Sequence, residues 1–219
     1  MFAMKKKIAI IAALCLALAT FAAVLTACGE ENTTIPRYGE YFFYRDEALG
    51  GLVLEVPRSS SVASGALVLP EESWWYAETA EGEETEHAEA LPVVAIASGA
   101  FEYNSKLTSV TLPEGLKQVG DRAFYSCTAL TSVTINGTAV RIGKESFEYC
   151  SALSSVTGGS VAAVGERAFF ACSSLGSFCA VDDNAVIGSR AFGYTGIESA
   201  DDIGATGSNI AADAFGNAE

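Results

Sequence analysis

The sequence predicts a repeat solenoid made mainly of short parallel β-strands and the turns that join them. Two observations predict this fold: a short motif returns at a fixed interval, and an alternating apolar stretch follows it. The phenylalanines that close successive motifs are 23, 23, 22, 23 and 23 residues apart. Such a period is typical of a solenoid in which each repeat forms one coil. The six motifs are IASGAF (96–101), VGDRAF (119–124), IGKESF (142–147), VGERAF (164–169), IGSRAF (187–192) and IAADAF (210–215).

The stretch after each motif carries the strand signal. It starts at a leucine and then alternates, with Val, Ile and Thr prominent, which is typical of a half-buried strand. In the first stretch we expect Leu107, Val110 and Leu112 to face the core. Stacking of successive coils then predicts one parallel sheet along the solenoid. The stretches are LTSVTLP (107–113), LTSVTIN (130–136), LSSVTGG (153–159) and LGSFCAV (175–181).

The motif predicts the return half of each coil, as a turn or a short helical segment on the convex side. Its first apolar residue, its small residue and its phenylalanine should form three internal columns, so that each coil buries the apolar side of the next. A recurrent glycine suits a left-handed or a crowded backbone position. The small residues are Ala100, Ala123, Ser146, Ala168, Ala191 and Ala214, and the glycines are Gly120, Gly143, Gly165 and Gly188.

These residues carry a family resemblance. The unit LTSVTLPEGLKQVGDRAFYSCTAL resembles the BspA-like class of leucine-rich repeat, from about Leu91 to Phe215. The resemblance implies a leucine-rich-repeat solenoid of about five to six repeats of 22–23 residues over 91–219. It also implies a surface protein engaged in adhesion or protein binding, with no catalytic residues. Gly158-Gly159, the shortened segment 193–199 and the weak last unit depart from the pattern and predict fraying toward the C-terminus.

The N-terminus predicts export. A basic start and an apolar run from Ile8 to Val24 are typical of a signal peptide, although a short transmembrane anchor would look similar. The segment Leu25-Thr26-Ala27-Cys28 resembles a bacterial lipobox, which implies cleavage before Cys28 and lipid attachment to its sulfur. We therefore expect a signal peptide over 1–27, a tether over 28–37, and a protein anchored to the membrane on the extracytoplasmic face or cell surface, since two acyl chains anchor durably.

Composition excludes several function classes. The formal net charge of −14 becomes −17 once the three lysines of 1–27 are removed, and such an acidic surface repels nucleic acid. Cys127, Cys150 and Cys172 recur three residues after a motif phenylalanine, which favours buried thiols over disulfides. We expect no metal site and no cofactor, because zinc needs converging ligands and the chain's one histidine is His87.

Residues 38–90 are interpreted as an N-terminal cap with an acidic aromatic insert at 71–90. Strand signals cover 38–44 and 52–56, and Ala66-Leu67-Val68-Leu69-Pro70 resembles the end of the repeat strand. About 20 residues are then inserted before the next motif, and insertions in solenoids form loops, often on the binding face. This insert holds eight glutamates. It is either a binding loop for a protein, a sugar or weakly held calcium, or a cap, or disordered. Its aromatic residues are Trp74, Trp75 and Tyr76.

Two further columns are candidate ligand contacts. Hydroxyl side chains alternate with the core residues of the strands and would form either a recognition face or an ordinary solvated surface. One aromatic residue per coil follows the motif phenylalanine and would either pack the turn or form a contact patch. The hydroxyl columns are Ser109, Ser132, Ser155, Ser177 and Ser199, and Thr111, Thr134 and Thr157 continued by Cys179 and Asp201. The aromatic column is Tyr103, Tyr125, Tyr149, Phe170 and Tyr194.

The leading interpretation is a lipid-anchored surface protein that binds an extracellular protein or host matrix. The alternatives are a structural envelope component without a specific ligand, and a glycan-binding module that uses Trp74 and Trp75. An enzyme is not expected, because a nucleophilic triad would have to use His87 within the acidic insert.

Overall fold

The computed structural model describes residues 42–56, 64–75, 89–206 and 209–217. The chain divides into residues 1–33 and 34–219, and all of the described residues belong to the second unit. The expected signal peptide, Cys28, the tether, Tyr76 and His87 therefore lie outside the described residues. No helix within the described ranges is both long enough and apolar enough to span a membrane.

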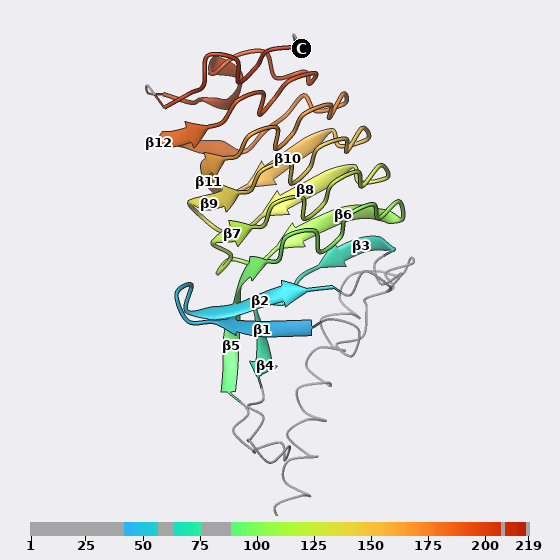
Figure 1. The fold of residues 1–219 in the computed structure, drawn as a ribbon, viewed down its shortest axis with the longest axis vertical. Coiled ribbons are helices and arrows are strands. Elements are labelled where there is room, and N and C mark those ends of the chain that lie inside the picture. The colour runs from blue at the N-terminus through green and yellow to red at the C-terminus, as the bar shows by residue number, and fades with distance from the viewer. Residues whose placement is uncertain (1–41, 57–63, 76–88, 207–208, 218–219) are drawn as a thin grey trace, which may run out of the picture. The chain divides into compact units, whose positions relative to one another are not determined.

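The described chain is a solenoid with two sheets along the stack, not the single sheet that we expected (Figure 1). One sheet has the order β10-β8-β6-β3 and is parallel throughout. The other has the order β1-β2-β5-β7-β9-β11-β12, with β4 paired to β5. The strands are β1 (Phe42–Asp46), β2 (Gly51–Glu55), β3 (Gly65–Val68), β4 (Glu72–Trp75), β5 (Glu89–Ile96), β6 (Leu107–Leu112), β7 (Gln118–Val119), β8 (Ser132–Ile135), β9 (Val140–Ile142), β10 (Ser155–Gly158), β11 (Ser160–Val164) and β12 (Ala180–Ile187).

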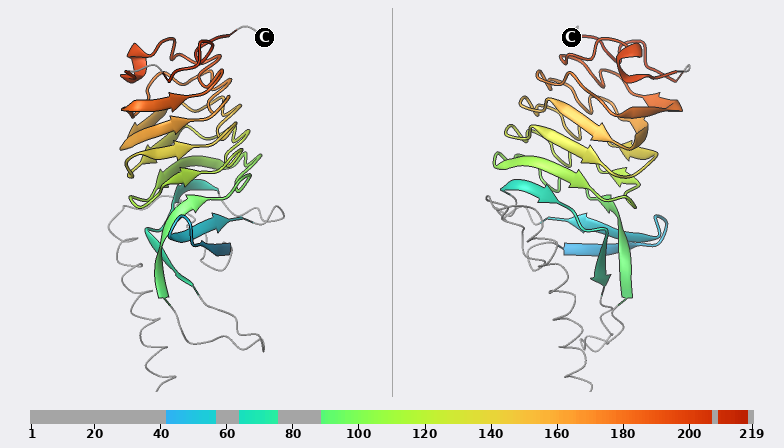
Figure 2. Two further views of the ribbon diagram at one scale, coloured as in Figure 1. Left: turned by 60° about the vertical axis from the view of Figure 1, so that its left-hand side comes forward. Right: turned by 180° about the vertical axis from the view of Figure 1, so that it is seen from behind.

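Each regular coil therefore has three sides: a strand of each sheet and a turn. The two views in Figure 2 show corresponding strands of successive coils side by side. The turns are joined by backbone hydrogen bonds as well. The Phe101 amide donates to the Ala123 carbonyl, and the Phe124 amide donates to the Ser146 carbonyl, both at 2.7 Å. Because these inter-coil bonds recur, the turns stack as regularly as the strands do.

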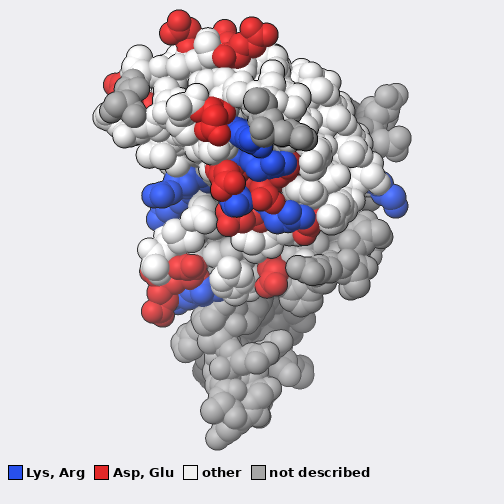
Figure 3. Space-filling model, turned by 45° about the horizontal axis from the view of Figure 1, so that its top comes forward, with Lys and Arg blue, Asp and Glu red and all other residues white. Residues whose placement is uncertain are grey.

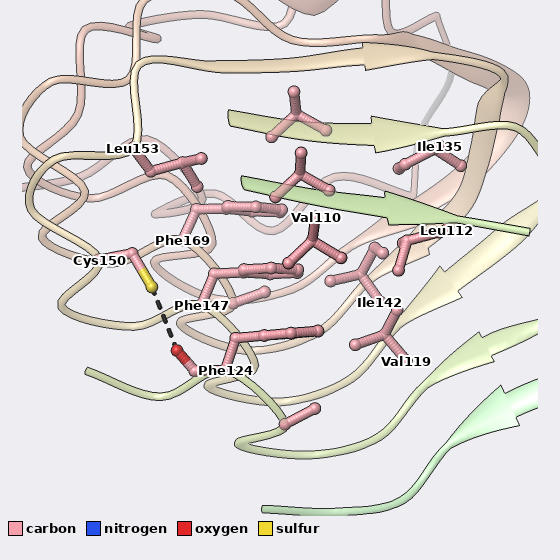
Figure 4. Packing of buried hydrophobic residues seen from close by; sticks show 14 of the residues in the cluster. Val110, Leu112, Val119, Phe124, Ile135, Ile142, Phe147, Cys150, Leu153 and Phe169 are labelled. Carbon is pink, nitrogen blue, oxygen red and sulfur yellow. Dashed lines mark hydrogen bonds between the residues drawn. The ribbon is translucent and has the colours of Figure 1, made fainter. Parts of the chain in front are cut away.

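The six motif phenylalanines form one file through the core, as predicted. Neighbouring rings are stacked, with centroids 5.0 to 5.6 Å apart and planes within 10° of parallel. Figure 4 shows three of these rings beside the apolar residues of both sheets. Five of the six are buried, and Phe215 in the last coil is half-buried. The small-residue column beside them is buried too, including Ser146.

The recurrent glycine is required by crowding rather than by a left-handed backbone. A Cβ atom on Gly120 would lie 2.6 Å from the backbone nitrogen of Ser98, and one on Gly188 would lie 2.6 Å from that of Glu166. The left-handed positions occur two residues before and two residues after the motif phenylalanine, and they are filled mainly by other residues. The first set is Gly99, Arg122, Glu145, Arg167 and Arg190, and the second is Tyr103, Ser126, Tyr149, Ala171 and Tyr194.

The N-terminal strands extend the stack by one coil. β2 pairs in parallel with β5, and β3 pairs in parallel with β6, so that Leu67 lies beside Val110 as the sequence comparison suggested. β1 forms an antiparallel hairpin with β2 and lies at the end of the longer sheet. The insert is not simply a loop, because β4 pairs antiparallel with the first half of β5 and makes a second hairpin.

Two departures from the repeat have local physical causes. Residues 175–179 form only a bridge at Ser177, and the following residues Ala180 and Val181 already belong to β12. Phe178 stands where the other coils have valine, and its ring packs edge-on against the Phe169 and Phe192 rings, each 5.1 Å away. At Gly159, where the coil is one residue shorter, a Cβ atom would lie 1.7 Å from the Gly137 carbonyl oxygen. Only glycine fits there, so this segment is closely packed rather than frayed.

Candidate binding surfaces

The two hydroxyl columns lie in register on the sheet formed by β3, β6, β8 and β10. Ser132 pairs with the serines of both neighbouring strands, and Thr134 pairs with both threonines. These hydroxyl residues are half-buried, except for the exposed Thr157. The columns are Ser109, Ser132 and Ser155, and Thr111, Thr134 and Thr157.

Toward the C-terminus the structure corrects the expected extent of these columns. Ser177 continues the serine column through its bridge to Ser155. Cys179 does not continue the threonine column, because its side chain is 6% exposed and belongs to the core cluster. Ser199 and Asp201 lie beyond the strands, and Asp201 begins a short 3₁₀ helix, η2 (Asp201–Ile203). Residues 178 and 179 lie outside any strand, so the regular alternation of the earlier coils does not extend to Cys179.

The aromatic column runs along the turn side and its members contact one another. Successive rings meet edge to face, with centroids 5.4, 5.7, 6.3 and 5.2 Å apart. Such pairs stabilise the turns beyond simple area burial. Exposure alternates along the column: Tyr103, Tyr149 and Tyr194 are 63%, 42% and 44% exposed, whereas Tyr125 is half-buried and Phe170 is buried. The column therefore both packs the turns and presents a tyrosine on every second coil.

This alternation reflects two kinds of turn. In one kind, the exposed tyrosine occupies the left-handed position, with φ of 62° at Tyr103 and Tyr149 and 56° at Tyr194. In the other kind, a small residue occupies the same position, at Ser126 and Ala171, and the aromatic residue comes one position earlier. A large aromatic side chain at positive φ is uncommon. The sequence signal is the alternation of Phe-Glu-Tyr, or Phe-Gly-Tyr in the third case, with Phe-Tyr-Ser and Phe-Phe-Ala. It appears only when coils are compared two at a time.

Ion pairs join the same turns. Arg122 pairs with Glu102 of the preceding coil and with Glu145 of the following one. Its guanidinium carbon lies 3.8 Å from the centre of the Tyr125 ring. Hydrogen bonding to Glu102, and then to Glu145, raises the pKa of Arg122 above its ordinary value, so this guanidinium stays charged. Figure 3 shows acidic and basic side chains interleaved in one patch on one face of the molecule.

A second ion pair repeats this arrangement two coils on. Arg167 pairs with Glu148 of the preceding coil, and its guanidinium carbon lies 4.0 Å from the centre of the Phe170 ring. Glu148 is 2% exposed, which makes it one of two buried polar residues of the described chain. A buried carboxylate requires such a partner, because an unpaired buried charge is strongly unfavourable. These ion pairs were not predicted from the sequence.

The thiol column is internal, as predicted. Cys127, Cys150 and Cys172 are buried and free, and each thiol donates to the carbonyl oxygen of a phenylalanine in the preceding coil, at 3.0 to 3.2 Å (Figure 4). The Cys150 thiol and burial raise the pKa of Cys127, and burial raises the pKa of Cys150. Burial also raises the pKa of Cys179 to about 11. The thiols of Cys127, Cys150 and Cys179 are therefore structural groups held in the unreactive protonated form.

The remaining predicted site residues within the described ranges are the two tryptophans of the insert. Trp74 and Trp75 lie in β4, where they pair with Ala90 and Glu89 of β5. The structure thus brings the hydroxyl columns together on one sheet and the aromatic column along the turns, and it puts the two tryptophans in the hairpin. Within the described ranges, no group of three or more His, Cys, Asp or Glu side chains could hold a metal ion.

Comparison with known proteins agrees with this coil architecture. The model of the family described as BspA type Leucine rich repeat region matches residues 94–219, in six copies. No curated protein matches the sequence.

Among solved structures, the chain is similar to a leucine rich cell surface protein from Faecalibacterium prausnitzii A2-165, with 23% identity and a TM-score of 0.48, over 76% of this chain and 48% of that one. It thus spans about half the length of that protein. A leucine-rich repeat protein from Bacteroides ovatus is 17% identical, with a TM-score of 0.41, over 77% of this chain and 58% of that one. The leucine-rich repeat protein of T. pallidum is 18% identical, with a TM-score of 0.39, over 74% and 89% of the two chains.

Proposed function

Since its C-terminal part from residue 94 onward matches that family, the chain belongs to the BspA type leucine-rich repeat family, and we propose that it is a cell-surface binding module. Its ligand is an extracellular protein or host-matrix component, and its role is adhesion. The proposal assigns the chain no catalytic step.

The observation that carries this proposal is the in-register repetition of side chains on the outside of the coil stack. Ser132 lies directly beside the serines of both neighbouring coils, and Thr134 lies beside both threonines. Neighbouring strands are about 4.8 Å apart, so the same group returns at that interval along the stack. A surface of this kind offers a long ligand several equivalent contacts. It therefore suits a macromolecule better than a small molecule.

The test is saturable capture of purified extracellular-matrix proteins by the full chain. On the sheet formed by β3, β6, β8 and β10, which carries the hydroxyl columns, Ser132→Lys and Thr134→Lys each place a long charged side chain in the middle of a column. The matched control is Lys106→Ser, which changes charge at an exposed position near the start of β6. We expect the first two variants to lose capture and the control to keep it. Absence of saturable binding by the unmodified chain to any matrix protein or glycan would favour a structural spacer instead.

The hairpin of β4 and β5 provides a separate test. In the glycan-binding alternative, Trp74 and Trp75 of this hairpin supply the contact. Replacing both with alanine should then abolish capture of polysaccharide, although the serine and threonine columns on β6, β8 and β10 are unchanged. Capture that survives this change would exclude the hairpin as the binding element.

Surface display is the second part of the proposal. We propose that lipid on Cys28 anchors the protein to the extracytoplasmic face of the membrane. Cys28→Ala should move the protein from the membrane fraction to the soluble fraction after expression in a bacterium that processes lipoproteins. Continued recovery with membranes would contradict lipid anchoring.

A further inference from the structure

The turns of the inner coils bind one another through backbone amides that all point along the stack in one direction. The amide of each motif phenylalanine donates to the carbonyl of the small residue in the next coil, at 2.7 to 2.8 Å. The amides two residues before and two residues after that phenylalanine donate to the next coil as well. Each turn therefore offers three amides to the coil that follows it.

The last coil of the described chain, residues 209–217, repeats this arrangement without a following coil. The corresponding amides belong to Asp213, Phe215 and Asn217, and among the described residues none of the three has a hydrogen-bond acceptor. The Ile210 carbonyl likewise lacks a donor there, whereas the carbonyl of Ile187 accepts from the Ala211 amide. The contacts between successive inner turns thus define how one further coil would bind.

Apolar side chains at this end are incompletely covered. The Phe215 ring stacks on Phe192 with centroids 5.6 Å apart, and no other described aromatic ring lies against it. Phe215 is half-buried, although the five earlier motif phenylalanines are buried. Ile210 is half-buried too, whereas Ile187 of the preceding coil is 1% exposed. A further coil would bury both Phe215 and Ile210.

The two ends of the longer sheet differ. At one end, β1 pairs antiparallel with β2 over five residues and closes the sheet. At the other end, β12 is followed within the described ranges only by the bridge between Ile187 and Ile210. Terminal coils of a solenoid need a closing element. The buried Ile203 of η2 provides part of one, and the turn at 210–217 is left without such cover among the described residues.

The charge of this end favours a basic partner. Residues 180–217 contain six acidic side chains and one basic side chain, Arg190, which pairs with Asp213. Figure 3 shows acidic side chains grouped at the upper end of the view, where the C-terminal coils lie. A second copy of this chain would bring a formal charge of −14 toward these carboxylates, whereas Lys and Arg side chains would be attracted. The six are Asp182, Asp183, Glu198, Asp201, Asp202 and Asp213.

We propose that the turn edge of the last coil, residues 210–217, binds a repeat coil of the same type that belongs to another polypeptide and carries basic side chains. Carbonyls at alternate residues of that coil accept from the amides of Asp213, Phe215 and Asn217, and its aromatic ring stacks on Phe215. Addition of backbone hydrogen bonds to an open edge is a general mode of peptide recognition. The inference goes beyond the proposed function, because the hydroxyl columns take no part in it.

The probe is a fluorescent peptide with the sequence of residues 119–141, one full coil, carrying Asp121→Lys and Cys127→Ala. One control peptide has the same composition in scrambled order. The other keeps Asp121 and carries Arg122→Glu and Arg141→Glu, so that it is acidic. Binding to the purified full chain is measured by fluorescence anisotropy. We expect saturable binding of the basic coil peptide, at least about tenfold tighter than either control, because the scrambled peptide cannot form the coil and the acidic one is repelled.

Variants of the full chain locate the contact. Phe215→Ala removes the ring on which the peptide ring stacks, and Ile210→Arg places a charge among the apolar side chains of this end. We expect each to weaken binding of the basic peptide about tenfold. Asp201→Lys reverses one exposed charge of this end and should weaken it about threefold. The control is Val68→Arg, which changes a 60% exposed side chain on β3 and should leave binding unchanged.

Three results would overturn the proposal. Equal binding of the basic and the scrambled peptides would reduce the interaction to charge. Unchanged binding in both Phe215→Ala and Ile210→Arg would place the contact elsewhere. We expect the chain alone to sediment as a monomer, so self-association that Ile210→Arg abolishes would assign this end to a second copy. Matrix capture is measured separately with Ser132→Lys, a variant that should bind the basic peptide normally, so the two proposals can fail independently.

Discussion

Ser146 offers a test of how the core tolerates polarity. Its side chain is 0% exposed, and among the described residues its Oγ atom has no hydrogen-bond partner. It occupies the small-residue column, in which the other five coils have alanine. Burying a hydroxyl without a partner costs about 1–3 kcal/mol, so Ser146→Ala should raise the free energy of unfolding by about 1 kcal/mol once the small lost contact volume is subtracted.

The measurement is urea unfolding of the full chain, supported by calorimetry. For a protein of this size, 1 kcal/mol corresponds to a rise in Tm of about 2–4 °C. The reverse change is available in the preceding coil, where Ala123 is also 0% exposed. Ala123→Ser should lower the unfolding free energy by about 1–3 kcal/mol. If Ser146→Ala destabilises the protein, or if both variants shift stability in the same direction, the column does not have the apolar character assigned to it.

Three further predictions concern the core and the turns. Phe147→Ala removes a ring from the middle of the stacked file and should cost about 3–5 kcal/mol in urea unfolding, with a loss below about 1 kcal/mol contradicting the stack. Arg167→Ala leaves the buried Glu148 carboxylate unpaired and should cost on the order of 3 kcal/mol, whereas the double variant with Glu148→Gln should recover part of that loss. The Cys150 thiol and burial raise the pKa of Cys127 in the folded state, and burial raises the pKa of Cys150. Only the unfolded chain therefore loses these protons as pH rises above about 8.5, and the free energy of unfolding should fall there by up to about 1.4 kcal/mol per pH unit for each thiol. Replacing both thiols with alanine should flatten that fall, and an unchanged slope would show that other groups cause it.

The sequence predicted the columns of the coil stack well because their information is local and repeated. A residue such as Phe124 recurs at the same interval in every coil, and any parallel stack must place such residues in one file. The same reasoning predicted the buried thiols and the register of Ser132 and Thr134 with their neighbours. Because the pattern occurs six times, each copy independently indicates whether a given position is buried or exposed.

The second sheet was missed because two of the strands that it has in the regular coils are too short to show alternation. β7 is two residues long and β9 is three, so a period of two cannot be recognised in either. Cys179 was assigned to the wrong side because the strand of the earlier coils is absent at residues 178–179, and the alternation that the prediction assumed does not hold there. The ion pair between Arg167 and Glu148 joins two neighbouring coils. A comparison of each single coil with the repeat consensus does not reveal such a contact.

The alternation of two kinds of turn has a consequence for how this stack can grow or shrink. Because equivalent turns recur only on every second coil, the full structural repeat is a pair of coils, 45 or 46 residues long. Excising a single 23-residue unit would bring two Phe-Glu-Tyr turns together, so that two tyrosines would abut and one glutamate would lose its arginine. Excising or duplicating the pair of coils whose turns hold Phe124 and Phe147 would keep the two kinds of turn in alternation. Stable natural or engineered variants of this chain should therefore differ in length by an even number of coils.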